Sequence, residues 1–155
     1  MILAISLKSH TTINFSFMKK RDPVTTIMTQ KIYTVKVNDK LTDVIELVRK
    51  HNIRHVPVLD GKHLVGIISK SDLNRLTFSG LFEEQDTSDE AILNMLTISQ
   101  VMTHKPRVVP STYTIQDVAM ILATEEFHAL PVVDPQDETK LVGIVTTTDV
   151  IRCIL

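Results

Sequence analysis

The chain has 155 residues, the usual size of one compact domain, with room for two small repeats. Lys and Arg total 17 against 18 Asp and Glu, and a formal net charge of −1 gives no reason to expect nucleic acid as a partner. No apolar run approaches the roughly 18 residues that span a bilayer, so we expect no membrane insertion. One cysteine, Cys153, excludes an internal disulfide and fits a reducing compartment such as the cytoplasm.

The first residues do not match a secretion signal. Residues 1–17 are mildly apolar, but they lack a basic start, a continuous apolar core and a small-residue cleavage site. Met18 precedes three basic residues and offers an alternative start. We therefore interpret residues 1–22 as an N-terminal arm, or an over-extended start, outside the fold.

The rest of the chain contains a repeat. Residues 24–29 and 98–103 both end in Met-Thr, a shift of 102 − 28 = 74. The same shift aligns residues 41–51 with 115–125, where the apolar spacing predicts an amphipathic helix. It also aligns two apolar, β-branched runs with an early proline, 55–59 and 129–133, which are typical of strands.

A turn of different length follows in each copy, at residues 60–63 and at residues 135–140, so the offset becomes 143 − 66 = 77. Residues 64–73 then align with 141–150, and both stretches predict a strand that runs into a helix. Each copy thus reads as strand, helix, strand, strand, helix. The predicted elements are 33–35, 41–51, 55–59, 64–69 and 71–76, then 107–109, 115–125, 129–133, 141–146 and 148–154.

Three strands and two helices cannot bury both faces of a sheet, so the copies should pack together. The predicted fold class is α/β (α+β): two βαββα repeats, residues 23–77 and 98–155, packed sheet to sheet about a pseudo-twofold axis. Residues 78–97 form an acidic linker in which residues 87–90 predict a capping box opening a short helix. The acidic run is a solvated linker or, in the alternative, a docking surface for a basic partner.

Taken together, the Met-Thr motif, the helix, the x-h-P-h-h-D strand and the G-h-h-S/T-x-S/T-D motif resemble tandem CBS (cystathionine beta-synthase) domains, a Bateman module, over residues 23–155. The resemblance implies a stand-alone, non-catalytic sensor whose two clefts bind an adenine nucleotide, AMP, ADP or ATP. It also implies a homodimer and, since no catalytic region accompanies the pair, an effector protein in trans. The alternatives are an S-adenosylmethionine sensor and a ligand-free dimerisation or interaction module.

Two aspartates are candidate ribose ligands. Asp72 and Asp149 begin the last helix of each copy, and a carboxylate can accept hydrogen bonds from two ribose hydroxyls. Neighbouring hydroxyls can bind phosphate beside free backbone N–H groups, and they belong to Ser69, Ser71, Thr146 and Thr148. The same S/T-x-x-D pattern is also a helix capping box. The resemblance favours the ribose role, and the two roles need not exclude each other.

The resemblance implies further contacts. Adenine would meet backbone and apolar groups, unless these residues only pack in the core: Ile32, Tyr33, Thr34, Val56, Pro57, Pro106, Arg107, Val108, Leu130 and Pro131. Phosphate would meet Arg54, His55 and His128, and Ala129 departs from that basic pattern. We expect the first copy's site, which also has Lys70, to tolerate more phosphate charge than the second. Gly66 and Gly143 are interpreted as letting the backbone approach the ligand.

The sequence offers no metal or catalytic site. His51 and His55 lie four residues apart with His63 nearby, but a strand start interrupts the helical spacing and no cysteine or carboxylate cluster joins them. There is no Ser-His-Asp arrangement and no Gly-rich phosphate loop. We therefore expect no catalytic residues, no metal and no catalytic cofactor.

Overall fold

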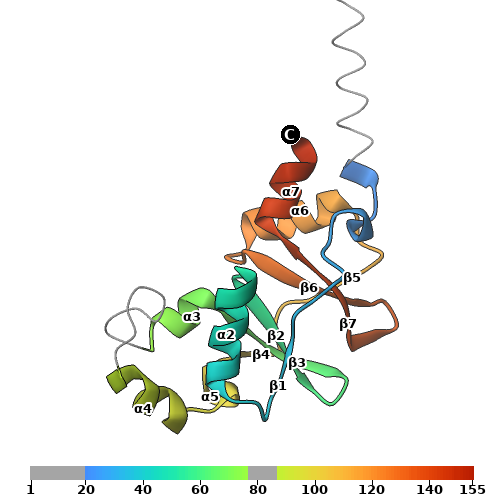
Figure 1. Ribbon diagram of the computed structural model, residues 1–155. Coiled ribbons are helices and arrows are strands. Elements are labelled where there is room, and N and C mark those ends of the chain that lie inside the picture. Colours follow the sequence, from blue (N-terminus) through green and yellow to red (C-terminus); the bar gives the residue numbers. More distant parts are fainter. Residues whose placement is uncertain (1–19, 77–86) are drawn as a thin grey trace, which may run out of the picture.

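The computed structural model describes residues 20–76 and 87–155 (Figure 1). Most of the expected N-terminal arm and the first part of the acidic linker lie outside the described residues. Among the helices of the two described ranges, none combines the length and the apolar character that a membrane span requires.

The two repeats form the expected βαββα order. The first consists of β1 (Val35–Lys36), α2 (Leu41–His51), β2 (His55–Asp60), β3 (His63–Ser69) and α3 (Lys70–Asn74). The second consists of β5 (Val109–Pro110), α6 (Ile115–Thr124), β6 (Ala129–Asp134), β7 (Asp137–Thr146) and α7 (Thr147–Ile154). In each repeat the short first strand pairs parallel with the second, which pairs antiparallel with the third. The predicted mixed α/β fold of two repeats is therefore confirmed.

The helices form where the apolar spacing predicts them. The buried face of α2 presents Leu41, Val44, Ile45 and Val48 to the first core. The helix ends at Asn52, which adopts the left-handed conformation (φ 49°) that asparagine tolerates. In the linker, α4 (Thr87–Met95) begins at the residue where we expected a helix, and it packs against α2.

The turn that we expected over residues 135–140 is wrong, because β7 begins at Asp137. The turn is tight: Asp134 pairs with Asp137, and the Asp134 carboxylate accepts the N–H of Gln136 at 2.9 Å. The Lys140 ammonium lies 3.0 Å from the same carboxylate across the hairpin. The polar residues after the turn read as loop in the sequence, but they continue the strand beyond the core, where both faces meet solvent.

The core of each repeat is completed by a segment that lies at the start of the other repeat. Ile98 of α5 (Ile98–Val101) and Met102 pack in the first core, and β4 (Thr103–His104) pairs with β3. Val24 of η1 (Val24–Thr26) packs in the second core. Thr29 then pairs with Ile144 of β7 through two backbone hydrogen bonds of 2.9 and 3.0 Å.

This exchange follows the pseudo-twofold relation. The bridges Pro23–Thr114 and Lys40–Thr97 correspond to each other under the shift of 74 residues, since 23 + 74 = 97 and 40 + 74 = 114. The four-stranded sheet β1-β2-β3-β4 contacts the three-stranded sheet β5-β6-β7 through β3 and β7. Figure 1 shows α2 and α3 at one end of the molecule and α6 and α7 at the other.

The strand glycines accommodate methionines. A Cβ atom at Gly66 would lie 2.3 Å from Sδ of Met102, and one at Gly143 would lie 2.3 Å from Sδ of Met28. Our interpretation of these glycines as space for a ligand is therefore wrong. They admit the methionine of the exchanged Met-Thr segment, which the sequence places far away in the other half.

Candidate ligand-binding clefts

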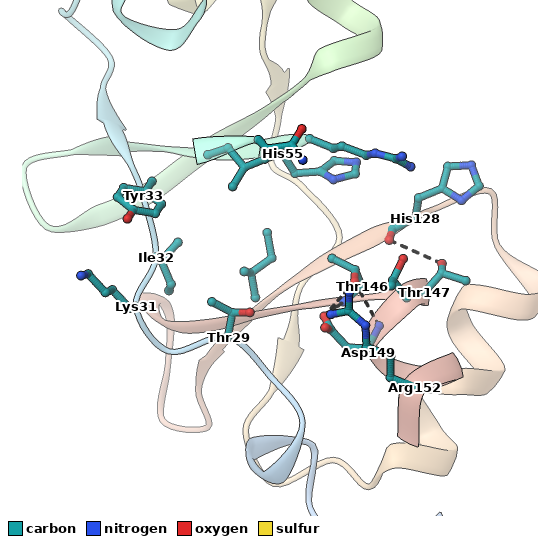
Figure 2. A pocket seen from close by; sticks show the side chains of 15 residues that line it. Thr29, Lys31, Ile32, Tyr33, His55, His128, Thr146, Thr147, Asp149 and Arg152 are labelled. Carbon is teal, nitrogen blue, oxygen red and sulfur yellow. Dashed lines mark hydrogen bonds between the residues drawn. The ribbon is translucent and has the colours of Figure 1, made fainter. Parts of the chain in front are cut away.

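Two clefts lie between the repeats, and each combines residues of both. The larger, of about 650 Å³, we call the Asp149 cleft (Figure 2). It is lined by Thr29, Lys31, Ile32, Tyr33, Asn52, Ile53, Arg54, His55, His128, Ile144, Thr146, Thr147, Thr148, Asp149 and Arg152.

The smaller cleft, of about 410 Å³, we call the Asp72 cleft. It is lined by His55, Ile67, Ser69, Ser71, Asp72, Arg75, Thr103, Pro106, Arg107, Glu126, Phe127, His128, Ala129 and Pro131. The exchanged segments explain why the clefts are mixed. Each Met-Thr segment crosses to the opposite sheet. The residues between this segment and the first strand of its own repeat therefore lie beside the start of the last helix of the other repeat.

Both aspartates cap a helix with one oxygen. Oδ2 of Asp149 accepts the backbone N–H of Thr146 at 2.8 Å and the Thr146 hydroxyl at 2.7 Å. Oδ2 of Asp72 makes the same contacts with Ser69, at 2.9 and 2.6 Å. The capping role is therefore real in both copies. It uses Oδ2 of each carboxylate, and both aspartates line their clefts. Oδ1 of Asp72 lies 3.9 Å from the guanidinium of Arg75, one helical turn further on.

One pair of equivalent positions carries different chemistry in the two clefts. The rings of Tyr33 and His51 stack with centroids 3.7 Å apart and planes 17° apart. The shift of 74 places Arg107 and Glu125 at the same positions, since 33 + 74 = 107 and 51 + 74 = 125, and these side chains form an ion pair of 3.3 Å. The Asp149 cleft thus has an aromatic wall where the Asp72 cleft has a guanidinium.

The clefts also differ in charge. The Asp149 cleft has three cationic side chains and one carboxylate, 3 − 1 = +2: Lys31, Arg54, Arg152 and Asp149. The Asp72 cleft has two cations and two carboxylates, 2 − 2 = 0: Arg75, Arg107, Asp72 and Glu126. Both sums count histidine as neutral.

The grouping that we expected for phosphate contacts is wrong. Arg54 of the first repeat lines the cleft that contains Asp149 of the second repeat, and Lys70 lines neither cleft. The more cationic cleft is therefore defined by the second repeat's aspartate. The order of residues in the sequence cannot reveal this, because it does not show that the Met-Thr segments cross between the two halves of the molecule.

His55 and His128 line both clefts. Burial of the His55 ring lowers its pKa below the ordinary value, and nearby His128 and Arg54 lower it further, while Asp72 opposes them. At the position equivalent to His55 the second repeat has Ala129, and His128 itself is equivalent to Arg54. The wall between the clefts thus has two imidazoles, one contributed by each half.

The lowered pKa of His55 predicts a pH-dependent stability. Between the folded-state pKa and the unfolded value of about 6.5, the unfolded chain binds more protons. The free energy of unfolding should therefore fall as pH drops through about 6.5 and level off below the folded-state pKa. His55→Ala should flatten this step in urea unfolding between about pH 8 and pH 5. An unchanged step in that variant would contradict the prediction, and His63→Gln is the control.

The structure brings most of the predicted site residues to a cleft. These are Ile32, Tyr33, Arg54, His55, Ser69, Ser71, Asp72, Pro106, Arg107, His128, Pro131, Thr146, Thr148 and Asp149. Val56 and Leu130 are instead fully buried in the two cores. They alternate along β2 and β6 with His55 and Pro131, which face the clefts, because successive strand residues point to opposite faces. Pro57 is buried outside both linings, and Thr34 and Val108 also lie outside them.

Several lining residues were not among those predicted. Arg75 and Arg152 lie three residues after the aspartates, and this helical spacing could have indicated a shared face. Thr29 and Thr103 belong to the Met-Thr motif, which we used only to align the repeats. Phe127 follows α6, where no local pattern distinguishes it from a surface residue.

The fold and clefts define a class of protein: a two-repeat α/β module with a pair of inter-repeat clefts. Comparison with known families agrees, since the CBS domain profile matches residues 24–78 and 98–155. The chain belongs to the CBS domain family and carries two CBS repeats.

Individual relatives extend this comparison. The uncharacterized protein MJ1426 of Methanocaldococcus jannaschii is 35% identical over 153 residues, covering 83% of this chain and 89% of that protein. The crystal structure of CBSX2 of Arabidopsis thaliana in complex with AMP has a TM-score of 0.70 at 30% identity, covering 84% of this chain and 95% of that one.

The CBS domain pair of protein MJ0100, in complex with 5'-methylthioadenosine and S-adenosyl-L-methionine, has a TM-score of 0.66 at 27% identity and covers 84% of this chain and 93% of that one. Several other curated relatives are longer proteins, and the chain spans less than two thirds of their length.

Proposed function

We propose that this protein is a non-catalytic regulatory module that binds an adenine nucleotide in its clefts and signals occupancy to an effector protein in trans. One observation carries the proposal: each cleft is lined by a carboxylate that caps a helix through Oδ2, with its Oδ1 outside the cap, and by neighbouring hydroxyl groups. A ribose supplies the vicinal hydroxyls that such an oxygen accepts. The AMP complex of CBSX2 and the S-adenosyl-L-methionine complex of MJ0100 support adenosine as the shared ligand element.

The Asp149 cleft offers a contact for each part of a nucleotide. Tyr33 and Ile53 present aromatic and apolar surface to a base, and Asp149 presents its oxygen to the ribose. A 5'-phosphate would lie near the hydroxyls of Thr146 and Thr148 at the start of α7, where the positive end of the helix dipole favours anions. Figure 2 shows Tyr33 and Asp149 on opposite sides of this cleft.

The charge difference supports different preferences in the two clefts. At +2, the Asp149 cleft favours ligands with more phosphate, because cations that share a cleft add to the attraction of each anionic group. The neutral Asp72 cleft favours AMP, or an adenosine derivative without phosphate such as S-adenosylmethionine. We propose two adenosine sites of one design and unequal affinity.

Isothermal titration of the full chain with AMP, ATP and S-adenosylmethionine tests the proposal. We expect AMP to fill two sites and ATP to prefer the Asp149 cleft. Arg54→Ala should weaken ATP by about 10- to 100-fold and AMP by less, because a hydrogen bond to a charged group contributes about 1.5–3 kcal/mol. Lys62→Ala, at the exposed tip of the first hairpin, is the matched control. Absence of binding by all three ligands would rule the function out.

A dimerisation or interaction module remains the second candidate, and an exposed apolar surface favours it. Met120 of α6 is 57% exposed, and Ile151 and Ile154 of α7 are 48% and 63% exposed. We propose that this surface forms the contact of a homodimer in the cytoplasm, whether or not the clefts are filled. Sedimentation velocity of the same preparation, with and without AMP, tests the dimer; a monomer in both would remove it from the proposal.

A further inference from the structure

The two histidines between the clefts belong to both sites. His55 is the first residue of β2 and His128 directly precedes β6, and both line the Asp149 cleft and the Asp72 cleft. Figure 2 shows their side chains along one edge of the Asp149 cleft, on the far side of Thr146 and Thr147 from Arg152. Ligands in the two clefts would therefore meet the same pair of rings.

We propose that His55 and His128 couple the two clefts. While the His55 ring is neutral, a phosphate bound in one cleft weakens the binding of a phosphate in the other, and protonation of His55 reduces this conflict. The inference rests on the proposed function, because it concerns phosphate-bearing ligands in the same clefts.

The chemistry of imidazole supplies the reason. A neutral ring has one N–H donor and one nitrogen lone pair, so it can donate to a phosphate on one side only. The lone pair and the first phosphate both repel a second phosphate across the shared wall. A protonated ring has two N–H donors and a positive charge, so it can serve both clefts.

The surroundings keep His55 neutral near pH 7.5 in the free protein, because burial and its cationic neighbours lower its pKa. The charged groups that line the clefts around the pair are Lys31, Arg54, Asp72, Arg75, Arg107, Glu126, Asp149 and Arg152. These side chains include both signs, so bound phosphate changes the local charge substantially. Phosphates in both clefts should raise the pKa of His55, and filling the second cleft should take up a proton.

Titration with AMP and with adenosine, at about pH 8 and about pH 6 in non-phosphate buffers, tests the coupling. Asp72→Asn and Asp149→Asn supply single-cleft references, since asparagine keeps a cap acceptor. At pH 8 we expect the second AMP to bind at least about fivefold more weakly than in the matching single-cleft variant. At pH 6 the difference should fall below about twofold, with proton uptake detected by comparing buffers of different ionisation enthalpy. Adenosine should show independent sites at both pH values.

His55→Ala provides the decisive variant, because Ala129 already occupies the equivalent position of the second repeat. It should reduce the pH dependence of the AMP coupling and the proton uptake, whereas His63→Gln, outside both clefts, should leave them unchanged. Equal coupling for AMP and adenosine, or coupling that does not vary with pH, would overturn the inference. Two filled but independent sites would overturn the coupling alone, while no binding of either ligand would overturn the proposed function with it.

Discussion

Asp149→Ala is expected to weaken AMP binding in the Asp149 cleft by about 10- to 100-fold. The carboxylate oxygen proposed to hold the ribose makes a charge-assisted hydrogen bond, which contributes about 1.5–3 kcal/mol, and each 1.4 kcal/mol changes affinity tenfold. The variant also loses the cap contacts with Thr146, at a cost of about 1 kcal/mol of stability. Titration calorimetry reports the first effect and thermal unfolding without ligand reports the second.

Asp117→Ala separates these two effects. The Oδ2 atom of Asp117 accepts the backbone N–H of Thr114 at 2.9 Å and its hydroxyl at 2.7 Å, which reproduces the cap around Asp149. Asp117 lines neither cleft. Its replacement should lower the melting temperature and leave AMP affinity intact. If Asp149→Ala behaves like Asp117→Ala, the aspartate only caps its helix and the ribose role is wrong.

Gly66→Ala is expected to destabilise the fold by about 1–3 kcal/mol, the usual cost of overpacking a core. The added methyl group would meet Sδ and Cγ of Met102, and the backbone oxygen of Thr103 lies 3.1 Å away. Met102 is 8% exposed and has little room to move. Gly143→Ala should cost less, because Met28 is only half-buried and no backbone atom is among its close contacts. Urea unfolding measures both.

A double-mutant cycle tests whether the methionine causes the cost. Met102→Ala alone should destabilise by about 2–5 kcal/mol through loss of buried volume. Combined with Gly66→Ala, the total should be smaller than the sum of the single changes, because the new methyl group fills part of the space that methionine leaves. Strictly additive changes, or a Gly66→Ala variant as stable as the original, would show that the strand tolerates a side chain here.

The local sequence pattern predicted the helices and strands well where the contacts that form them lie within a single repeat. The α2 helix has the bounds that its apolar spacing indicates, and β2 and β6 begin at His55 and Ala129 as expected. The first strands were predicted too early, since only two residues in each find a backbone partner on the neighbouring strand. The short elements η1, α5 and β4 were not predicted, because they form only where another part of the chain supplies the surface.

The site residues show the same contrast between what local sequence predicts and what depends on distant parts of the chain. Asp72, Asp149 and their hydroxyl neighbours could be selected from the sequence, because a strand end and a helix start lie next to each other in the chain. Val56 and Leu130 were placed at the ligand in error, because the resemblance gave the strand but not which of its faces meets the cleft. The repeat itself was visible at the level of sequence, since duplicated helices and strands need duplicated apolar patterns.

By itself, the sequence determined that this protein is built from two CBS-type halves and that each half has one aspartate at the start of its last helix, where the aspartate can cap that helix. Only the tertiary structure decided which residues share a cleft. The Met-Thr segments cross to the opposite sheet, where Gly66 and Gly143 admit Met102 and Met28. This crossing is a packing event between residues distant in the chain, and no local spacing encodes it. It gives the Asp149 cleft the greater positive charge and places His55 and His128 between both clefts.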